Sequence, residues 1–525
     1  MKTVKVPMRK YFSNKKSRLS AIAGLLAALQ ILLVVPVQAL GIPDVSSSVM
    51  SQLLDETTTE LAPGVREKKF AYKEQAFQWR TQCFCIDVDP GDQASISLGT
   101  PNDGTKYGMQ TVRSQANAAI HNGKNVVAAV NGDYYNMSTG EPQGVEIKNG
   151  VEIHGNRCNE PFFGIKNDGT PIIGDPSVYS QIKDDLKEAI GGPRILVCNG
   201  KSTNQTDIYY PCAAVGIRKD NSVFFIVVDG VQLPYSEGIT LQDLTQLLID
   251  MGAQDALMLD GGGSSTCLTR VPGDKDLSCV NSPSDGRERN VANSLLISTT
   301  LKSDGKFANA YITPQDKTYT PNSTVQMKAV GLDISGAPAS LPNSELTWSL
   351  SDSSFGTIDQ NGLLVSNGKT GQVQVKLSYN GKTVGTTYVE FAVPDEIGFL
   401  QAKNGLSLKA NEQNNLGLFV RYQGRDVTLK SGDIQWNTSN GIGTVDSQNV
   451  FHATNSVASG AATATVAGTS ISASISVKVG QLPQLLYDFE DGLSGWNSFT
   501  AGRGEKSEIS LTSLSDDPHS VSYPY

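Results

Sequence analysis

The chain has 525 residues, a formal net charge of −9 at pH 7 and four histidines. This length exceeds what one hydrophobic core supports, so we expect roughly three or more domains. The acidic balance argues against nucleic acid and anionic membranes as partners, and the histidines lack zinc-site spacing such as His-x-x-x-His, which argues against a zinc enzyme.

Residues 1–39 have the pattern of a secretory signal peptide. Cations precede an apolar stretch from Leu19 to Val35, and Val37-Gln38-Ala39 resembles a signal-peptidase site. An uncleaved anchor is the alternative interpretation of the same stretch. Both interpretations predict export, so we expect a secreted or cell-surface protein. No other window approaches the roughly 18 apolar residues that a membrane-spanning helix needs.

All seven cysteines precede residue 280. In an oxidising compartment some of them are expected to pair, and a bond between Cys267 and Cys279 would close a plausible hairpin. The odd number leaves at least one thiol free or paired elsewhere. Cys83-Phe84-Cys85 lacks the redox Cys-x-x-Cys spacing, so we interpret it as structural.

We assign residues 40–65 to a linker and residues 66–300 to a domain of α+β (mixed α/β) architecture, because strand-like and helix-like segments alternate there. The spacing of apolar residues predicts a helix from Tyr107 to Asn122. Thr240 followed by Asp243 predicts the start of a second helix, and Gly252 its end.

Three apolar segments each end in a short acidic or amide loop. The loops are Asn131-Gly132-Asp133, Asp229-Gly230 and the run from Asp260 to Ser265. Two of the segments follow predicted helices, as in αβ units, and ligands of such sheets gather at the carboxyl ends of strands. We therefore expect one cleft with three carboxylates, although each Asp-Gly pair also suits a simple turn.

The run after Asp260 has the composition of an anion-binding loop. Glycines let backbone N–H groups approach a ligand, and arrays of such groups bind anionic oxygens. The expected phosphate contacts are the backbone and hydroxyl groups of Gly261, Gly262, Gly263, Ser264 and Ser265. Asp260, Asp229 and Asp133 are the candidates for base or nucleophile, and Asp260 leads because the loop adjoins it.

Other residues near these loops have two interpretations each. Asn131 either binds a sugar or orients Asp133, or it is a left-handed turn residue. Arg289 either pairs with phosphate or forms a surface salt bridge. Tyr134 and Tyr135 either stack on a sugar or pack in the core. We expect two further sets to be solvated, Glu146 on a strand edge and a hairpin formed by Asp274, Asp276, Asp285, Arg287 and Glu288.

Taken in order, motifs between Asn125 and Ser298 resemble the phosphodiester glycosidase family of uncovering-enzyme-like catalytic domains. The matching segments are 131–135, 144–150, 162–169, 191–200, 214–216, 227–230, 259–266 and 281–286 with Arg289. The resemblance implies an exported hydrolase that cleaves between a sugar's anomeric carbon and phosphate in a glycan or cell-wall polymer. We expect no cofactor, with a divalent cation such as calcium as the alternative.

One motif departs from the family. Pro211-Cys212-Ala213-Ala214 stands where the family usually has Pro-Arg-Thr-Ala, and Arg194, Arg218 or Arg289 is the candidate replacement cation. Two alternative functions remain open. One is a non-catalytic binder of glycans or cell-wall polymers, and the other is a phosphodiesterase whose oxygen ligands hold a divalent cation such as Ca²⁺ or Mg²⁺.

The chain after residue 300 is rich in Ser, Thr, Gly and Val with alternating patterns. The motif Leu346-Thr347-Trp348 recurs as Ile434-Gln435-Trp436 at a spacing of about 88 residues, the size of an immunoglobulin-like sandwich. Residues 305–394 and 395–480 thus resemble bacterial Ig-like domains of group 2, which we interpret as spacers. Residues 485–525 resemble the start of a truncated carbohydrate-binding jelly roll.

Overall fold

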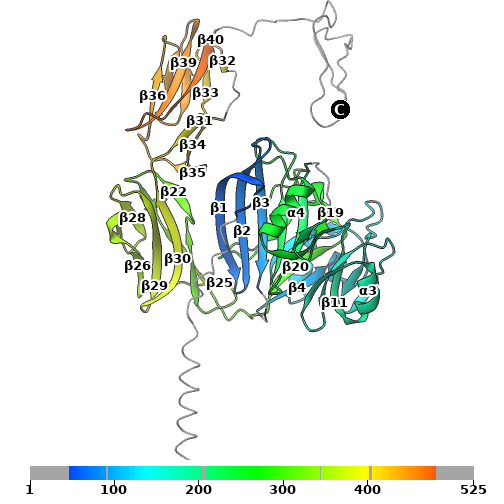
Figure 1. Cartoon of the computed structure of the whole chain (residues 1–525). Coiled ribbons are helices and arrows are strands. Elements are labelled where there is room, and N and C mark those ends of the chain that lie inside the picture. Colours follow the sequence, from blue (N-terminus) through cyan, green and yellow to red (C-terminus); the bar gives the residue numbers. More distant parts are fainter. Residues whose placement is uncertain are drawn as a thin grey trace, which may run out of the picture. The chain divides into compact units, whose positions relative to one another are not determined.

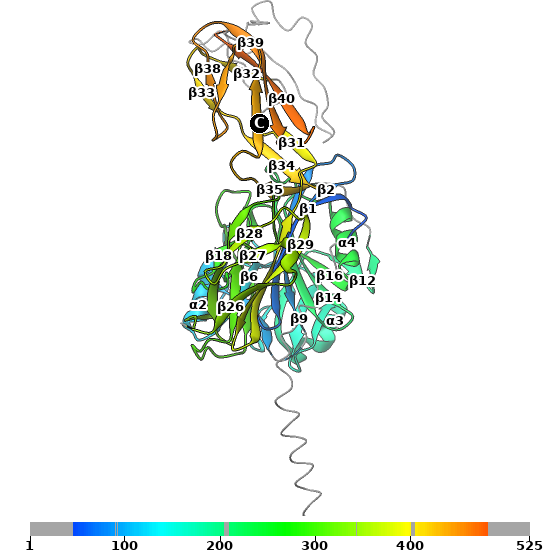
Figure 2. The same cartoon turned by 90° about the vertical axis from the view of Figure 1, so that its left-hand side faces the viewer.

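The computed structural model describes residues 46–89, 91, 93–203, 209–342, 344–400 and 405–480. The predicted signal peptide and jelly roll lie outside these residues. The chain divides into two compact units, one extending to Asp395 and including Arg421–Lys430, the other containing Glu396–Val420 and the residues from Ser431 onward. Strands make up 50% of the structure and helices 9% (Figures 1 and 2). Among the described residues, no helix combines the length and apolarity needed to cross a bilayer.

An eight-stranded sheet forms the centre of the first unit. Each strand pairs antiparallel with its neighbours, in the order β1 (Met50–Ala62), β2 (Val65–Glu74), β3 (Arg80–Val88), β15 (Val223–Val228), β14 (Cys212–Arg218), β16 (Ala253–Leu259), β12 (Ile195–Cys198) and β13 (Lys201–Ser202). Figure 1 shows β1, β2 and β3 side by side. The assignment of residues 40–65 to a linker is wrong for 50–62, because β1 pairs with β2 and buries Leu54 and Leu61.

Two five-stranded sheets and a two-stranded ribbon complete this part of the unit. Their orders are β18 (Ser278–Cys279), β17 (Cys267–Thr269), β6 (Val126–Asn131), β20 (Ser294–Thr299) and β4 (Ala94–Gly99); β10 (Pro171–Gly174), β9 (Phe162–Lys166), β11 (Leu186–Gly191), β7 (Glu146–Lys148) and β8 (Val151–His154); and β19 (Asn290–Val291) with β5 (Gln110–Thr111). Every pairing recorded in them is antiparallel.

Three α-helices are described, α2 (Val112–His121), α3 (Pro176–Ile182) and α4 (Leu241–Asp250), with 3₁₀ turns at η1 (Pro101–Asp103), η2 (Lys183–Asp185), η3 (Gly262–Ser264) and η4 (Ser353–Phe355). α4 begins as predicted, because the Thr240 side chain accepts from the Asp243 N–H. The first predicted helix starts later than expected, at Val112, where Thr111 caps it. The leucines of α4 pack on one face of the eight-stranded sheet, whose other face packs against β4, β6 and β20.

This topology brings strand ends together, though not through the parallel αβ units that we expected. Because β15 and β16 both pair antiparallel with β14, their carboxyl ends lie at the same edge of the sheet. β3 pairs antiparallel with β15 from the other side, so its first residues lie at that edge too. Asp229 and Asp260 follow β15 and β16 directly, and both therefore lie at this edge.

The cysteines are all free, and the expected bond between Cys267 and Cys279 is not formed. In the hairpin of β17 and β18, the residue opposite Cys279 is Leu268. Because successive side chains of a strand point to opposite faces, Cys267 and Cys279 project away from each other. Cys267 accordingly packs in one core cluster and Cys279 against another.

The repeated motifs after residue 300 form equivalent strands. The first copy contains β26 (Leu346–Leu350), β27 (Gly356–Ile358) and β29 (Gly371–Tyr379), and the second β36 (Ile434–Thr438), β37 (Gly443–Val445) and β39 (Ala458–Val466). Each copy has a core of its own. The other strands are β21 (Asn309–Thr313), β22 (Lys317–Tyr319), β23 (Thr324–Gln326), β24 (Lys328–Leu332), β25 (Pro338–Ala339), β28 (Leu363–Ser366), β30 (Lys382–Phe391), β31 (Glu396–Phe399), β32 (Leu406–Leu408), β33 (Gln413–Asn415), β34 (Leu418–Tyr422), β35 (Arg425–Thr428), β38 (Val450–Ala453) and β40 (Ser472–Val479).

Candidate active site

Four hydrogen bonds join the end of β6 to the glycine-rich loop after β16, one of them from the Asn131 backbone N–H to the Thr266 carbonyl at 3.2 Å. The Asn131 side-chain N–H donates to the Asp260 carbonyl at 2.7 Å, and its Oδ1 accepts from the Thr266 N–H at 2.9 Å. The Asp260 N–H donates to the Gly132 carbonyl at 2.8 Å. Asn131 is fully buried, so it holds the two loops together rather than facing a ligand.

The third glycine of the loop makes room for an arginine. A Cβ built on Gly263 would lie 2.2 Å from an Arg289 guanidinium nitrogen and 2.2 Å from the Asp285 carboxylate. Asp285 accepts from the Arg289 Nε at 2.8 Å, and a second guanidinium nitrogen lies 3.4 Å from the Ser264 hydroxyl. The ion pair with Asp285 thus holds the Arg289 guanidinium against the loop. We expected Asp285 in a solvated hairpin and did not predict this contact with Arg289. The fold brings residue 285 back to the glycine-rich loop, which the sequence alone does not show.

Asp260 is the most accessible of the three candidate carboxylates, with 7% of its surface exposed against 1% for Asp229 and Asp133. Burial raises the pKa of Asp260 to about 6, and the Ser264 hydroxyl and Arg289 oppose this rise. A carboxyl group with this pKa changes charge near neutral pH, as a general base must. The neighbouring Ser265 hydroxyl is buried and has no hydrogen-bond partner among the described residues.

The Asp229 carboxylate lies at the same sheet edge, but three donors already occupy it. Its Oδ1 accepts from the Asn281 amide at 2.8 Å, and its Oδ2 accepts from the Ser282 N–H at 2.8 Å and the Tyr235 hydroxyl at 3.0 Å. Burial raises its pKa, and these donors lower it. Asp229 therefore positions the loop at 281–282, which precedes Arg289.

Asp133 is enclosed by backbone. Its two oxygens accept from the N–H groups of Tyr134 and Gly144, both at 2.7 Å. A Cβ on Gly144 would meet the Gly191 Cα at 2.5 Å and Asp133 at 2.8 Å, so only glycines fit around this carboxyl. Burial raises its pKa well above the usual range. The geometry gives Asp133 a positioning role, and its catalytic role remains a prediction without support from its contacts.

Glu146 is fully buried, and the expectation of a solvated edge charge is wrong. The Asn293 side-chain N–H donates to the Glu146 Oε1 at 2.6 Å, and the Asn293 Oδ1 accepts from the Asp133 N–H at 2.7 Å. Burial raises the pKa of Glu146 to about 7. β7 lies inside its sheet between β8 and β11, which is why this strand has no solvated edge.

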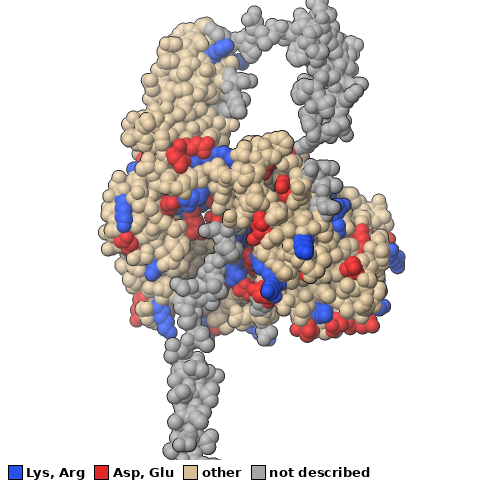
Figure 3. Space-filling view, viewed as in Figure 1, with Lys and Arg blue, Asp and Glu red and all other residues tan. Residues whose placement is uncertain are grey.

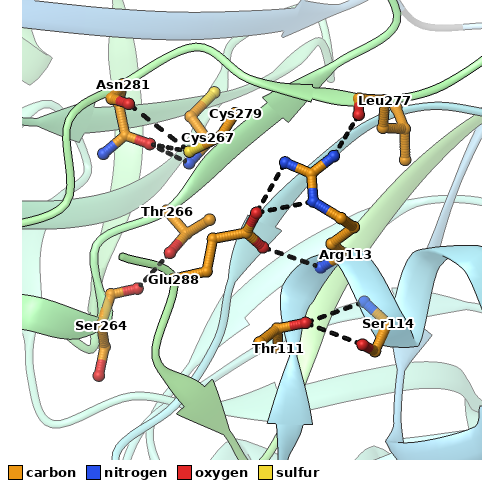
Figure 4. Close-up of polar contacts among 10 residues, drawn as sticks. All are labelled: Thr111, Arg113, Ser114, Ser264, Thr266, Cys267, Leu277, Cys279, Asn281 and Glu288. Carbon is orange, nitrogen blue, oxygen red and sulfur yellow. Dashed lines mark hydrogen bonds and ion pairs between the residues drawn. The ribbon is translucent and has the colours of Figure 1, made fainter. Parts of the chain in front are cut away.

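The segment that carries Arg289 is anchored at both ends (Figure 4). Arg113, at the start of α2, pairs with Glu288 at 2.7 Å and also donates to the Leu277 carbonyl. At the other end the Asn281 Oδ1 accepts from the Cys267 N–H at 2.8 Å. Glu288, expected to be solvated, therefore helps to place its neighbour Arg289.

Two tyrosines and a second arginine lie on the other side of the loop. A Cβ on Gly261 would lie 3.6 Å from the Tyr210 ring, and the Gly262 N–H donates to the Pro211 carbonyl at 2.9 Å. Tyr134 and Tyr210 are each half-buried and lie within electrostatic range of Arg194. Sequence reasoning missed Tyr210, whose only signal was its position just before the departing Pro211-Cys212 motif.

The environments of Cys212 and Arg218 narrow the choice of replacement cation. Cys212 is fully buried in the core beneath α4, near Tyr134 and Tyr210. Arg218 lies at the far end of β14 and pairs with Asp87 at 2.6 Å, away from the glycine-rich loop. Of the other two candidate cations, Arg289 contacts this loop and Arg194 lies within electrostatic range of Tyr134 and Tyr210.

Figure 3 shows acidic and basic side chains interspersed on the face in view, without a continuous basic field. Within the described ranges, no group of three or more His, Cys, Asp or Glu side chains is arranged to hold a metal ion.

Residues 124–298 match the family model of the phosphodiester glycosidases, and the chain thus carries a domain of this family. This assignment supports a glycosidase-like hydrolase function. A Bacillus subtilis (strain 168) protein, the SPbeta prophage-derived uncharacterized protein YomE, is 30% identical over 256 residues, which are 46% of this chain and 35% of that protein. The chain therefore spans about a third of this relative's length.

Two solved structures are also similar. The zebrafish N-acetylglucosamine-1-phosphodiester alpha-N-acetylglucosaminidase catalytic domain is 20% identical, with 46% of this chain and 87% of that chain covered and a TM-score of 0.38. A hypothetical protein from Synechocystis is 10% identical, with 47% of this chain and 64% of that chain covered and a TM-score of 0.37.

Proposed function

We propose that the protein hydrolyses the bond between a sugar's anomeric carbon and phosphate in a phosphodiester of a glycan or cell-wall polymer. The observation that carries the proposal is the loop after Asp260. There, Arg289 fixed by Asp285 and a Ser265 hydroxyl without a partner among the described residues adjoin the most accessible of the three candidate carboxylates. The family assignment of residues 124–298 supports the same reaction class.

The phosphate binds the loop in this proposal. Arg289 pairs with the phosphate oxygens, which charge-assisted hydrogen bonds favour. The Ser265 hydroxyl, which has no partner among the described residues, donates to the same oxygens. The backbone N–H groups of Gly262, Ser264 and Ser265, which we expected to bind phosphate, already donate to backbone carbonyls. The half-buried Tyr134 and Tyr210 offer ring faces to the sugar.

The leaving group makes a strong general acid unnecessary. A phosphate monoester has a second pKa near about 6, so it departs largely without protonation. Ordinary glycosides need a raised-pKa acid instead. The bond between the anomeric carbon and the bridging oxygen breaks, the oxygen leaves with phosphate, and water supplies the new hydroxyl. Asp260 accepts water's proton as base, or attacks the anomeric carbon first as nucleophile.

We extend the proposal to the rest of the chain. The cation-rich, apolar pattern of residues 1–39 supports export to the surface or medium. The two β-rich repeats, each with its own core, support Ig-like modules that separate the hydrolase from its attachment point.

The test uses the full chain and the methyl phosphodiester of N-acetylglucosamine 1-phosphate, in water enriched in ¹⁸O. Release of free sugar carrying ¹⁸O, abolished by Asp260→Asn and retained by Asp276→Asn, supports the proposal. Asp276 is an exposed carboxylate outside the site and serves as the matched control.

Two other outcomes contradict it. Binding of the diester without turnover identifies a non-catalytic binder, an alternative that the departing Cys212 motif raises. Chelator-sensitive hydrolysis with ¹⁸O in the phosphate identifies a cation-dependent phosphodiesterase instead.

A further inference from the structure

A cluster of three aromatic rings stands at the sheet edge that carries the candidate active site. Phe77 and Trp79, in the turn between β2 and β3, stack with ring centroids 4.6 Å apart. Tyr209 meets Trp79 edge-on at 5.4 Å and Phe77 at 6.4 Å. Phe77 is 60% exposed, which is unusual for so large an apolar side chain. We call these three residues the aromatic platform.

A buried carboxylate fixes the turn that presents the platform. Glu74 is only 4% exposed, and its carboxylate accepts from the N–H groups of Ala76, Phe77 (2.5 Å) and Trp79 (3.1 Å). Gln78 adopts a left-handed φ of 61°, and its amide donates to the Glu74 carbonyl at 3.1 Å. These contacts hold the turn in one shape, so the rings are preorganised before a ligand arrives.

The platform is continuous with the candidate active site. Tyr209 precedes Tyr210, whose ring lies beside Gly261 of the glycine-rich loop. β3 begins at Arg80, directly after Trp79, and the neighbouring Gln82 carbonyl accepts the Asp229 N–H at 3.1 Å. Tyr209 is thus adjacent in sequence to Tyr210 beside the loop, and Trp79 lies three residues before Gln82, which bonds Asp229 at the same end of the sheet.

The chemistry of the platform suits a sugar ring. Pyranose faces carry C–H groups that stack on aromatic rings, while their rims carry hydroxyls that need hydrogen-bonding partners. Gln75 and Gln78 flank Phe77 in the turn. Their side-chain N–H groups donate to the Met50 and Glu74 carbonyls, and their side-chain oxygens can accept further hydrogen bonds from sugar hydroxyls.

From this arrangement we infer that the aromatic platform is a second carbohydrate subsite. It binds a sugar unit of the polymer next to the one whose phosphate occupies the glycine-rich loop. The identity of the polymer rests on the proposed function. The site itself rests on the three rings, the turn that holds them and the two segments that connect them to the candidate active site. The platform therefore selects chains over isolated sugar phosphodiesters.

The test compares a monomer with a chain, using the full protein. The probes are the methyl phosphodiester of N-acetylglucosamine 1-phosphate and a phosphodiester-linked tetramer of N-acetylglucosamine 1-phosphate. Tetramer affinity is measured by calorimetry in the Asp260→Asn background, where turnover does not interfere. Added substitutions are Phe77→Ala, Trp79→Ala and Trp79→Phe, with Tyr388→Ala, an exposed tyrosine on β30, as matched control.

We expect Phe77→Ala and Trp79→Ala each to weaken tetramer binding by about tenfold, the scale of one lost ring contact. Trp79→Phe retains most of the affinity, and Tyr388→Ala retains all of it. In the background that keeps Asp260, the kcat/KM for the monomer stays within about twofold of the parent, because the platform does not touch the reacting sugar.

Tetramer affinity that is unmeasurable in the parent, or unchanged by both alanine substitutions, overturns the inference. So does sedimentation that shows a dimer converted to monomers by Phe77→Ala, since the rings would then bind a second copy of the chain. If the monomer is not hydrolysed at all, the proposed function fails. Platform-dependent tetramer binding would still establish the subsite in that case.

Discussion

The raised pKa of the buried Asp260 carboxyl predicts that ionising this group destabilises the folded protein. Burial raises its pKa from 3.8 to about 6, so the folded protein holds this proton to a higher pH than the unfolded chain does. Between about pH 4 and pH 6 the native state therefore binds more protons, and its free energy of unfolding falls as pH rises. Above about pH 6 the full destabilisation is present; below about pH 4 it is absent.

The magnitude follows from the size of the shift. One pKa unit corresponds to about 1.4 kcal/mol, so ionised Asp260 destabilises the folded state by about 3 kcal/mol at pH 7.5. Asparagine has nearly the same shape and never ionises. We expect Asp260→Asn to abolish turnover and to raise the free energy of unfolding by about 2–3 kcal/mol at pH 7.5, with little change near pH 4.

Differential scanning calorimetry at pH 4 and pH 7.5 measures this difference. For a domain of about 150–250 residues, 1 kcal/mol shifts Tm by about 2–4 °C, so the affected transition should rise by about 4–12 °C at pH 7.5. Asp276→Asn, which removes an exposed carboxylate, should shift it by less than about 2 °C. A Tm that is unchanged or lower at pH 7.5, or raised equally at both pH values, refutes the reasoning.

Four further predictions concern the same loop. Because a base or nucleophile acts when ionised, kcat/KM should rise about tenfold per pH unit below about pH 6 and level off above it; a profile that falls through this range would make Asp260 an acid instead. Ser265→Ala should lower kcat/KM by about tenfold or more without lowering Tm, because the hydroxyl has no partner among the described residues. Ser298→Ala removes another buried hydroxyl of this kind and should leave kcat/KM and Tm unchanged. Gly263→Ala should displace the ion pair of Arg289 with Asp285 and raise KM by about tenfold. The control is Gly104→Ala, because a Cβ at Gly104 would have its nearest neighbour at 3.4 Å. Equal KM values for the two variants would contradict the proposed phosphate contact. Glu288→Gln should lower the free energy of unfolding by about 1 kcal/mol and raise KM, because it breaks the partly buried ion pair with Arg113 that positions Arg289. Unfolding and kinetic measurements on Arg113→Gln should give similar changes.

Local patterns were sufficient to predict several elements. Thr240 and Asp243 predicted the start of α4, because a capping interaction involves residues only three positions apart. The repeat of Leu346-Thr347-Trp348 at Ile434-Gln435-Trp436 predicted β26 and β36, because alternation along one strand is also a local property.

The sequence by itself also singled out the loop from Asp260 to Ser265, because its glycines and hydroxyls follow one another directly at a strand exit. That this loop binds an anion stays a prediction. Only the tertiary structure decided which of the three acids is least enclosed. Asp133, Asp229 and Asp260 are alike in sequence, but burial and hydrogen bonds come from segments far along the chain. Gly144 and Ser282 donate to the first two carboxylates, whereas Asp260 accepts from Ser264 and Gly261 of its own loop and lies near Arg289. The sequence determines which residues can carry a charge. Folding determines how each of them is solvated and which groups form hydrogen bonds or ion pairs with it.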